Sequence, residues 1–437
     1  MSPTSFDPAP FSARRQTLLK QLGDGVALIP TAPERVRNRD SLYPYRFDSY
    51  FWYLTGFPEP EAALVLVGGE TPRTLLFCRE KNVEREIWDG FRYGPATACE
   101  AFGVDEAYPI DELEQRLPEL IADRAVLWHA LGHDPDWDRK ITGALGTVRT
   151  QSRAGKRAPA QIRDPRELLD RLRLIKDAHE LDCLRRAADI ASAGHARAMR
   201  TCRPGLPEYA LEAELIYEFR RQGASGHSFP PIVAGGASAC VLHYVNNDKI
   251  LAEGTLVLVD AGCEFAGYAA DITRTYPVSG HFSAAQRDVY EVVLAAQQAA
   301  VAAIAPGVPF IAYHEAALRV LVQGMVDLGL LGGEVDGLIE SEAYKPFYMH
   351  RTGHWLGLDV HDAGDYKTDG EWTLLATGMT LTVEPGLYIA PGSDAPAPLQ
   401  GIGIRIEDDV LVTAAGAEVY TSAPRSVAAI EEAMRSE

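Results

Sequence analysis

Short apolar runs alternate with more polar stretches along the first 150 residues of the chain. Runs of this length that are bounded by polar residues predict the strands of a mixed sheet. Residues 150–165 are basic, poor in apolar side chains and contain proline, so we expect a connector there. The predicted strands are GVALIP (25–30), EAALVLVGG (61–69), RTLLFCRE (73–80) and AVLWHAL (125–131).

Helix-start signals follow this connector. Asp164 is a good N-cap residue, Pro165 suits the first helical position, and Glu167 is an acid at the third. A second start lies at Asp177, with Glu180 three residues further along. The chain therefore changes from a strand-rich to a helix-rich segment at this point.

The second half of the sequence mixes helices with antiparallel hairpins, which predicts an α+β fold. We place a domain boundary near residue 173, so that a smaller N-terminal α/β domain spans 1–173 and a larger domain spans 174–437. The helices are expected at 208–222, 284–304 and 314–328, and the strand pairs at 256–276 and 379–412.

Composition excludes several classes of protein. Among 437 residues, 46% are hydrophobic and 24% charged, which is ordinary for a globular chain and argues against disorder. The formal net charge of −19 argues against a nucleic-acid or anionic-membrane partner. No signal-peptide or membrane-spanning run is visible. The six cysteines form no C-x-x-C pair, so we expect reduced thiols and a cytoplasmic protein.

In the second half, one aspartate, Asp260, ends an apolar strand and another, Asp271, begins the next strand. If Glu264–Gly267 forms the hairpin loop, Asp260 and Asp271 lie directly opposite each other, with Cβ atoms roughly 4.5–5.5 Å apart. Like charges at that separation repel unless a cation lies between them. Arg274 faces the other side of its strand, so it is a poor candidate for that cation. The alternative is a solvated turn with two surface acids.

Further metal-type side chains appear in the same half. Glu384 lies on the polar face of one strand and Glu407 on the polar face of another. The segment MHRTGHWLGLDVHD adds His350, His354 and His361. One such residue alone is usually a solvated or core side chain, but several in apolar strand contexts favour a metal site.

These segments resemble the metal-dependent aminopeptidases of the pita-bread fold, and specifically the bacterial Xaa-Pro aminopeptidases (aminopeptidase P). The resemblance implies a C-terminal pita-bread catalytic domain that follows a smaller N-terminal α/β domain. It covers nearly the whole chain. The matching stretches are RNRDSLYPYRFDSYFWYLTGFPEPEA (37–62), VLHY (241–244), DAGCEFAGYAADITRTYPVSG (260–280), HRTGHWLGLDVHD (350–362), LTVEPGLYIAP (381–391) and GIGIRIEDD (401–409).

The resemblance implies a site with two divalent metal ions. In it, the positions of Asp271 and Glu407 bridge both ions, Asp260 serves one ion, and the remaining two ligands serve the other. Four carboxylates and one imidazole are mostly hard donors, so we expect Mn²⁺, with Co²⁺ or Zn²⁺ as alternatives. The five implied ligands are Asp260, Asp271, His354, Glu384 and Glu407.

The resemblance also implies roles around these ions. Glu384 would take the proton from a water that attacks as a metal-bridged hydroxide. His243 and His361 would hydrogen-bond the substrate and its developing oxyanion, while Arg405 would orient a ligand carboxylate. We expect His350 in the prolyl pocket and Tyr388 near it. Three N-terminal side chains could contact substrate across a subunit interface, with a surface or core role as the alternative: Asp40, Trp88 and Arg153.

The implied activity is release of the N-terminal residue from peptides that carry proline in second position, by a homo-oligomer (dimer or tetramer). Three alternatives stay open: prolidase, which has the same fold and ligands; a metal-free creatinase-type hydrolase; and a non-catalytic binding module. Turnover of Xaa-Pro against Xaa-Pro-Yaa separates the first, and metal content the others. The stretch AGDYKTDGEWTLLATG (363–378) lacks an arginine that meets longer peptides in this family, so the preferred peptide length is open.

Overall fold

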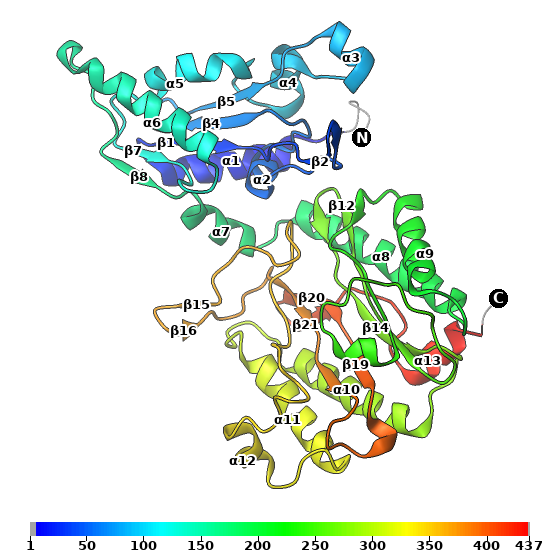
Figure 1. Cartoon of the computed structure of the whole chain (residues 1–437). Helices are drawn as coiled ribbons and strands as arrows, with labels where there is room; N and C mark the ends of the chain where they lie inside the picture. Colours follow the sequence, from blue (N-terminus) through cyan, green and yellow to red (C-terminus); the bar gives the residue numbers. More distant parts are fainter. Residues whose placement is uncertain (1–5, 436–437) are drawn as a thin grey trace. The chain divides into compact units, whose positions relative to one another are not determined.

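The computed structural model describes residues 6–435 and divides the chain into two compact units, Met1–Asp170 and Arg171–Glu437. The division falls within helix α7 (Arg166–Leu174). The domain boundary that we expect near residue 173 stays a prediction. Figure 1 shows that helices and strands are mixed in both units, and this mixture confirms the expected α+β class. Within residues 6–435 we find no helix with the length and apolar character that crossing a bilayer requires.

The first unit is built on a mixed sheet with the strand order β6-β5-β4-β1-β7-β8. Strand β4 pairs antiparallel with β1 and β5, whereas β6, β7 and β8 join through parallel pairs. The four predicted strands are confirmed as β1, β4, β5 and β7. The bounds are β1 (Val26–Pro30), β4 (Ala63–Val67), β5 (Arg73–Cys78), β6 (Glu106–Pro109), β7 (Val126–Trp128) and β8 (Gln161–Arg163).

Alternate residues of the sheet bury against helices. Val65 and Val67 of β4 share a hydrophobic cluster with Leu117 of α5 and Ile141 of α6, as the two-residue period of a strand requires. Helices α1 and α2 contact β4 and β1. The remaining elements are α1 (Ala9–Leu22), β2 (Val36–Asn38), β3 (Ser41–Leu42), α2 (Ser49–Thr55), α3 (Val83–Asp89), α4 (Gly94–Phe102), α5 (Leu113–Ile121) and α6 (Pro135–Thr150).

The predicted connector at 150–165 was wrong in part, because it contains β8. This strand pairs with β7 at the edge of the sheet, and all three of its residues are exposed. An exposed edge strand does not need the apolar run by which buried strands are recognised. The polar sequence of β8 therefore gave no signal that predicts a strand.

The second unit combines two packed helix pairs with short curved sheets. Figure 1 shows α8 beside α9 and α10 beside α11, with strands between the pairs. Its helices are α8 (Ala178–Thr201), α9 (Glu208–Arg221), α10 (Ala284–Ala303), α11 (Ala312–Asp327), α12 (Val335–Glu340) and α13 (Val427–Ala433). Its strands are β9 (Gly226–His227), β10 (Ile232–Gly235), β11 (Leu256–Asp260), β12 (Cys263–Phe265), β13 (Tyr268–Ala269), β14 (Thr273–Pro277), β15 (Lys367–Thr368), β16 (Glu371–Trp372), β17 (Thr380–Val383), β18 (Gly386–Ile389), β19 (Ile402–Arg405), β20 (Asp408–Thr413) and β21 (Gly416–Val419).

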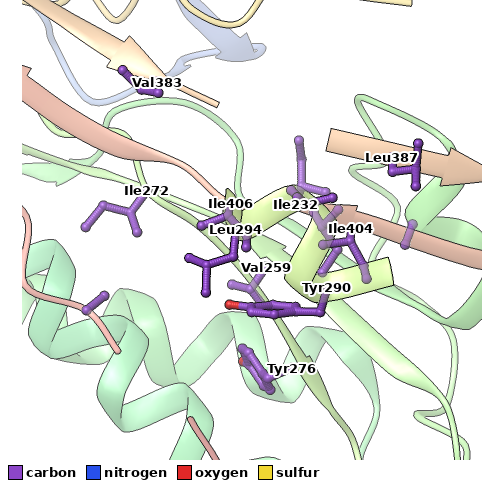
Figure 2. Close-up of a cluster of buried hydrophobic side chains, with 14 of the residues drawn as sticks. Ile232, Val259, Ile272, Tyr276, Tyr290, Leu294, Val383, Leu387, Ile404 and Ile406 are labelled. Carbon is purple, nitrogen blue, oxygen red and sulfur yellow. The ribbon is translucent and has the colours of Figure 1, made fainter. Parts of the chain in front are cut away.

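Local signals account for where α8 starts and what it covers. The Asp177 side chain accepts a hydrogen bond from the Glu180 backbone, and the Glu180 side chain accepts one from the Asp177 backbone. This capping box confirms the predicted helix start. In the core of the unit, Val259 of β11 and Ile404 of β19 are buried in one cluster with Tyr290 of α10 (Figure 2).

The hairpin that carries the two aspartates differs from our prediction. Asp260 pairs with Thr273, not with Asp271. The chain turns at only two residues, Ala266 and Gly267, both at positive φ, instead of over a four-residue loop. The register is therefore displaced by two positions, and a displacement of two keeps each side chain on the same face of the sheet.

Candidate metal centre

A cavity of about 720 Å³ opens in the second unit. Its walls come from the loop after β10, the ends of several strands, the start of α11 and the segment between α12 and β15. The five side chains expected to hold metal all line it: Asp260, Asp271, His354, Glu384 and Glu407.

The carboxylates reach the cavity from strand ends. Asp260 is the last residue of β11, Glu384 follows β17, and Glu407 lies between β19 and β20. Backbone hydrogen bonds fix two of these points: Glu384 N donates to Thr352 O at 2.7 Å, and Glu407 N donates to Thr273 O at 3.0 Å. Strand ends are suitable positions because the ladder holds the backbone while the side chain projects past it.

Three of these side chains come close enough to share one cation. Ligand atoms of Asp271, His354 and Glu407 all lie within 4.8 Å of one another. His354 Nε2 is 3.5 Å from Asp271 Oδ2 and 3.5 Å from Glu384 Oε1. Among the residues that the structure describes, the buried oxygens Asp260 Oδ1 and Asp271 Oδ1 have no hydrogen-bond partner. Such oxygens are costly to bury unless a cation or donor meets them.

Burial and mutual repulsion shift the pKa values of the acids in the cavity. The pKa of Asp271 is raised well above its usual value, first by burial and then by Asp260 and other nearby carboxylates. The pKa of Glu407 is raised well above its usual value by burial and by Asp271. Burial also raises the pKa of Glu384, while His354 opposes that change. Arg405 offsets only part of the negative charge of these four acids, and a metal ion would supply more positive charge.

The orientation of His354 suits a ligand. Its Nδ1 lies 2.9 Å from Trp355 O, and because a carbonyl only accepts, Nδ1 must carry the hydrogen. Nε2 is then the atom with the lone pair, and it is the atom that faces the acids. This arrangement is typical of metal-binding histidines, whose second nitrogen is held by a backbone carbonyl.

A chain of hydrogen bonds runs from Asp260 to His350. Arg405 Nη2 donates to Asp260 Oδ2 at 2.5 Å, and Arg405 Nη1 donates to Tyr388 Oη at 3.0 Å. Tyr388 Oη lies 2.9 Å from His350 Nε2, and His350 Nδ1 lies 2.7 Å from Arg351 O. Arginine can only donate, so Tyr388 Oη accepts from Arg405 and donates its own hydrogen to His350 Nε2. The hydrogen of the His350 ring is therefore on Nδ1, which donates to Arg351 O. Burial, and then Arg405, lower the pKa of His350 to about 3.

His243 and His361 also line the cavity. The rings of His354 and His361 meet edge to face, with centroids 4.3 Å apart. Burial lowers the pKa of His361, and His354 lowers it further. The next residue, Asp362, is buried and accepts from Arg173 at 2.6 Å and Lys176 at 2.9 Å, which anchors the segment.

The backbone before His354 is pressed against a strand. A Cβ added to Gly353 would lie 2.0 Å from Thr382 O, closer than any side chain tolerates. Glycine is therefore required there, and the neighbouring Thr352 is fully buried. The backbone conformation of the segment that carries His354 is therefore tightly constrained.

The remaining predicted contacts lie in the first unit. Asp40 and Arg153 are exposed, and the Trp88 side chain is 83% exposed on α3. Their contact with substrate stays a prediction.

Sequence reasoning missed several lining residues. Tyr313 and His314 on α11 both face the cavity, and His314 Nδ1 lies 2.8 Å from Thr352 Oγ1. Arg351 and Trp372 form part of another wall. Helix α11 carries no motif that marks these positions, but Arg351 lies directly after His350 and its place in that segment was a usable signal.

Two models of known protein families match the chain. The model of metallopeptidase family M24 matches residues 182–414, and the model of the aminopeptidase P N-terminal domain matches residues 11–128. The chain is 45% identical to the Xaa-Pro aminopeptidase of Escherichia coli K12, over 97% of this chain and 98% of that protein.

Solved structures are equally similar. Aminopeptidase PepP of Pseudomonas aeruginosa superposes with a TM-score of 0.96 at 49% identity, covering 98% of both chains. An Escherichia coli aminopeptidase P variant in complex with substrate has a TM-score of 0.96 at 44% identity, again over 98% of both chains. The chain therefore belongs to metallopeptidase family M24, in the aminopeptidase P branch of the pita-bread fold.

Proposed function

We propose that this protein is a Xaa-Pro aminopeptidase, which uses metal ions to release the N-terminal residue from peptides with proline in second position. One observation carries the proposal: four carboxylates and one imidazole converge in one cavity, and two buried carboxylate oxygens have no partner there among the described residues. Family membership and the relatives' activity support it.

The side chains present fit two divalent ions, which we expect to be Mn²⁺, with Co²⁺ and Zn²⁺ as alternatives. The oxygen-rich donor set and the free lone pair of His354 Nε2 are the structural support. Bound ions would acidify a water and polarise the scissile carbonyl. The proposed ligands are Asp260, Asp271, His354, Glu384 and Glu407.

Side chains of the protein would orient the substrate and transfer protons. Glu384, whose pKa burial raises, is placed to accept the proton of the attacking water. His361 has a lowered pKa and is neutral at pH 7, so one of its ring nitrogens can donate to the substrate while the other accepts. His243 is proposed to contact the substrate beside it. Arg405 keeps Asp260 oriented through their direct hydrogen bond.

The cavity wall suits a proline ring. The cavity has several apolar lining residues close together in the sequence: Phe229, Pro230, Ile232, Leu242 and Val245. Replacing the ring of proline by alanine removes about three methylenes, each worth on the order of 0.8 kcal/mol when buried, or roughly fiftyfold in kcat/KM. The acidic end of the cavity would hold the free amine of the substrate.

A peptide panel tests the proposal. We expect Mn²⁺-loaded enzyme to cleave Xaa-Pro-Yaa, to cleave Xaa-Ala-Yaa roughly fiftyfold less well, and to fail on N-acetylated peptide. Comparable kcat/KM for all three would show a different hydrolase. Faster turnover of the dipeptide Xaa-Pro than of Xaa-Pro-Yaa would indicate prolidase instead.

We further propose a cytoplasmic homo-oligomer, either a dimer or a tetramer. Exposed apolar side chains on and beside α3 support association, because large apolar groups in one segment commonly mark an interface. They are Val83 (71% exposed), Ile87 (78%) and Trp88 (83%). The six free cysteines fit a reducing compartment. Sedimentation of the intact chain, compared with a Trp88→Ser variant, would test the association.

A further inference from the structure

Two guanidinium groups line the cavity, and they differ in their partners. Arg405 is buried and donates to both Asp260 and Tyr388. Arg351 is exposed, and its guanidinium makes no hydrogen bond or ion pair with any described residue between positions 6 and 435. The remaining charged groups on the cavity wall are the four acids assigned above to metal. Arg351 is therefore a cation at the cavity mouth that has no anionic partner in this part of the chain.

An aromatic wall holds Arg351 in place. Its Cζ lies 5.6 Å from the centroid of the Trp372 ring, which stacks at 6.3 Å and 21° on Phe310. Both rings line the cavity. A cation–π contact of this kind uses no N–H hydrogen bond, so the N–H groups of Arg351 stay available for a planar, bidentate partner.

The charge of Arg351 is felt inside the cavity. Burial lowers the pKa of His314 to about 4, and Arg351 contributes to that lowering from its own position. A neutral ligand group would gain little from such a cation. A carboxylate matches it both in charge and in the geometry of paired N–H donors.

The separation of Arg351 from His354 is also compatible with the length of a bound peptide. Arg351 lies three residues from His354, so their Cα atoms are at most about 10 Å apart. A peptide whose first peptide bond is placed at the acids extends two further residues, or about 7 Å, before its third residue ends. The long Arg351 side chain can meet a carboxylate at that point.

The geometry points to Arg351 as a specificity-determining residue that binds a carboxylate at the third position of the substrate. That carboxylate is either the free C-terminus of a tripeptide or an acidic side chain at the third residue of a longer peptide. This inference deepens the proposed function and rests on it.

Lys367 offers a matched control. Its Nζ lies 4.2 Å from the centroid of the same Trp372 ring, and it is also exposed, but it does not line the cavity. Arg351→Met and Lys367→Met therefore remove the same charge from the same ring, and only the first removes it from the cavity.

The experiment compares kcat/KM for Ala-Pro-Ala, its C-terminal amide, and the amide of Ala-Pro-Glu. We expect the wild-type enzyme to prefer the free acid over the amide by roughly tenfold, mainly through KM, because the group lies away from the scissile bond. Arg351→Met should bring this ratio close to one, and Lys367→Met should leave it unchanged.

The third peptide distinguishes the two sources of the carboxylate. If Ala-Pro-Glu-amide regains the lost efficiency, an acidic side chain suffices; if not, the C-terminus is the group that Arg351 binds. The inference is overturned if Arg351→Met keeps the wild-type ratio or if Lys367→Met lowers it equally. Cleavage of the free-acid peptide Ala-Pro-Ala by the wild type reports the proposed function separately, and its absence would overturn both.

Discussion

Two buried acids that neighbour each other in the sequence, Glu407 and Asp408, have contrasting surroundings. Glu407 lines the cavity and accepts a hydrogen bond from Thr273, whereas Asp408 lies on the opposite side, next to Arg274. On the opposite side Asp408 is fully buried and accepts from Arg274 at 2.6 Å, from Gln297, from Thr421 and from Arg425. We call this the paired face.

The cavity face uses similar residue types but is short of positive charge. Asp260 Oδ1 and Asp271 Oδ1 lack partners there among the described residues. The pKa of Asp271 is raised by burial and then by Asp260, and that of Glu407 by burial and then by Asp271. Burial of acids is therefore not by itself a sign of function. Complete pairing marks Asp408 as a structural acid, whereas incomplete pairing makes the cavity acids candidates for a functional role.

Replacing Glu407 by Ala tests the cavity face and should have the largest effect. Loss of a shared ligand should abolish peptide turnover and lower the metal content, because even the groups that only orient a ligand are worth roughly 10–100-fold. Elemental analysis and kcat/KM check this, while the thermal midpoint of the metal-free protein should stay near wild type. Wild-type turnover in this variant would contradict the ligand assignment.

Arg274→Met tests the paired face. It leaves Asp408 buried without its main cation, which should lower the free energy of unfolding by about 3 kcal/mol. Urea denaturation measures the change. Arg425→Met is the control: its side chain is 40% exposed, so it should cost less than about 1 kcal/mol. Equal costs for the two variants would show that burial does not decide the strength of this pairing.

His361→Ala separates chemistry from metal binding on the cavity face. We expect kcat to fall by roughly a hundredfold, the usual contribution of a positioned proton or oxyanion donor, with metal content near wild type. Kinetics and elemental analysis on the same preparation check both parts. Parallel loss of metal and activity would make His361 a ligand.

His195 gives a pH test on the paired side, where its Nε2 donates to Ala261 O at 2.9 Å. Burial lowers its pKa to about 4, below the usual value near 6.5, so its contribution to stability is present above pH 6.5 and is lost as the pH falls toward 4. Relative to His195→Gln, wild-type protein should lose about 2 kcal/mol between pH 7.5 and pH 5. Parallel stability curves for the two proteins would exclude this contribution.

Sequence alone predicted the elements whose signals are local. The capping box of Asp177 and Glu180 and the apolar strands of the first unit were readable because each lies within a few residues. The exposed strand β8 was not, since it is recognised only by its pairing with β7.

The site shows the same limit. The hairpin prediction placed Asp260 and Asp271 on one face, and this survived a register that was wrong by two positions. The contributions of Tyr313 and His314 could not be predicted, because they depend on how α11 meets the strands, whereas Arg351 could have been found from its place directly after His350. Convergence in space is a property of tertiary packing that local patterns do not contain.

The tight contact at Gly353 has a consequence for how this enzyme can be altered. Position 353 admits no side chain, and Thr352 is buried. The backbone that carries His354 is therefore held in one conformation by its packing. Arg351, only two residues away, projects to the exposed rim. If Arg351 reads the third residue of the substrate, as inferred above, then evolution can change substrate preference at position 351 without moving the backbone that carries His354.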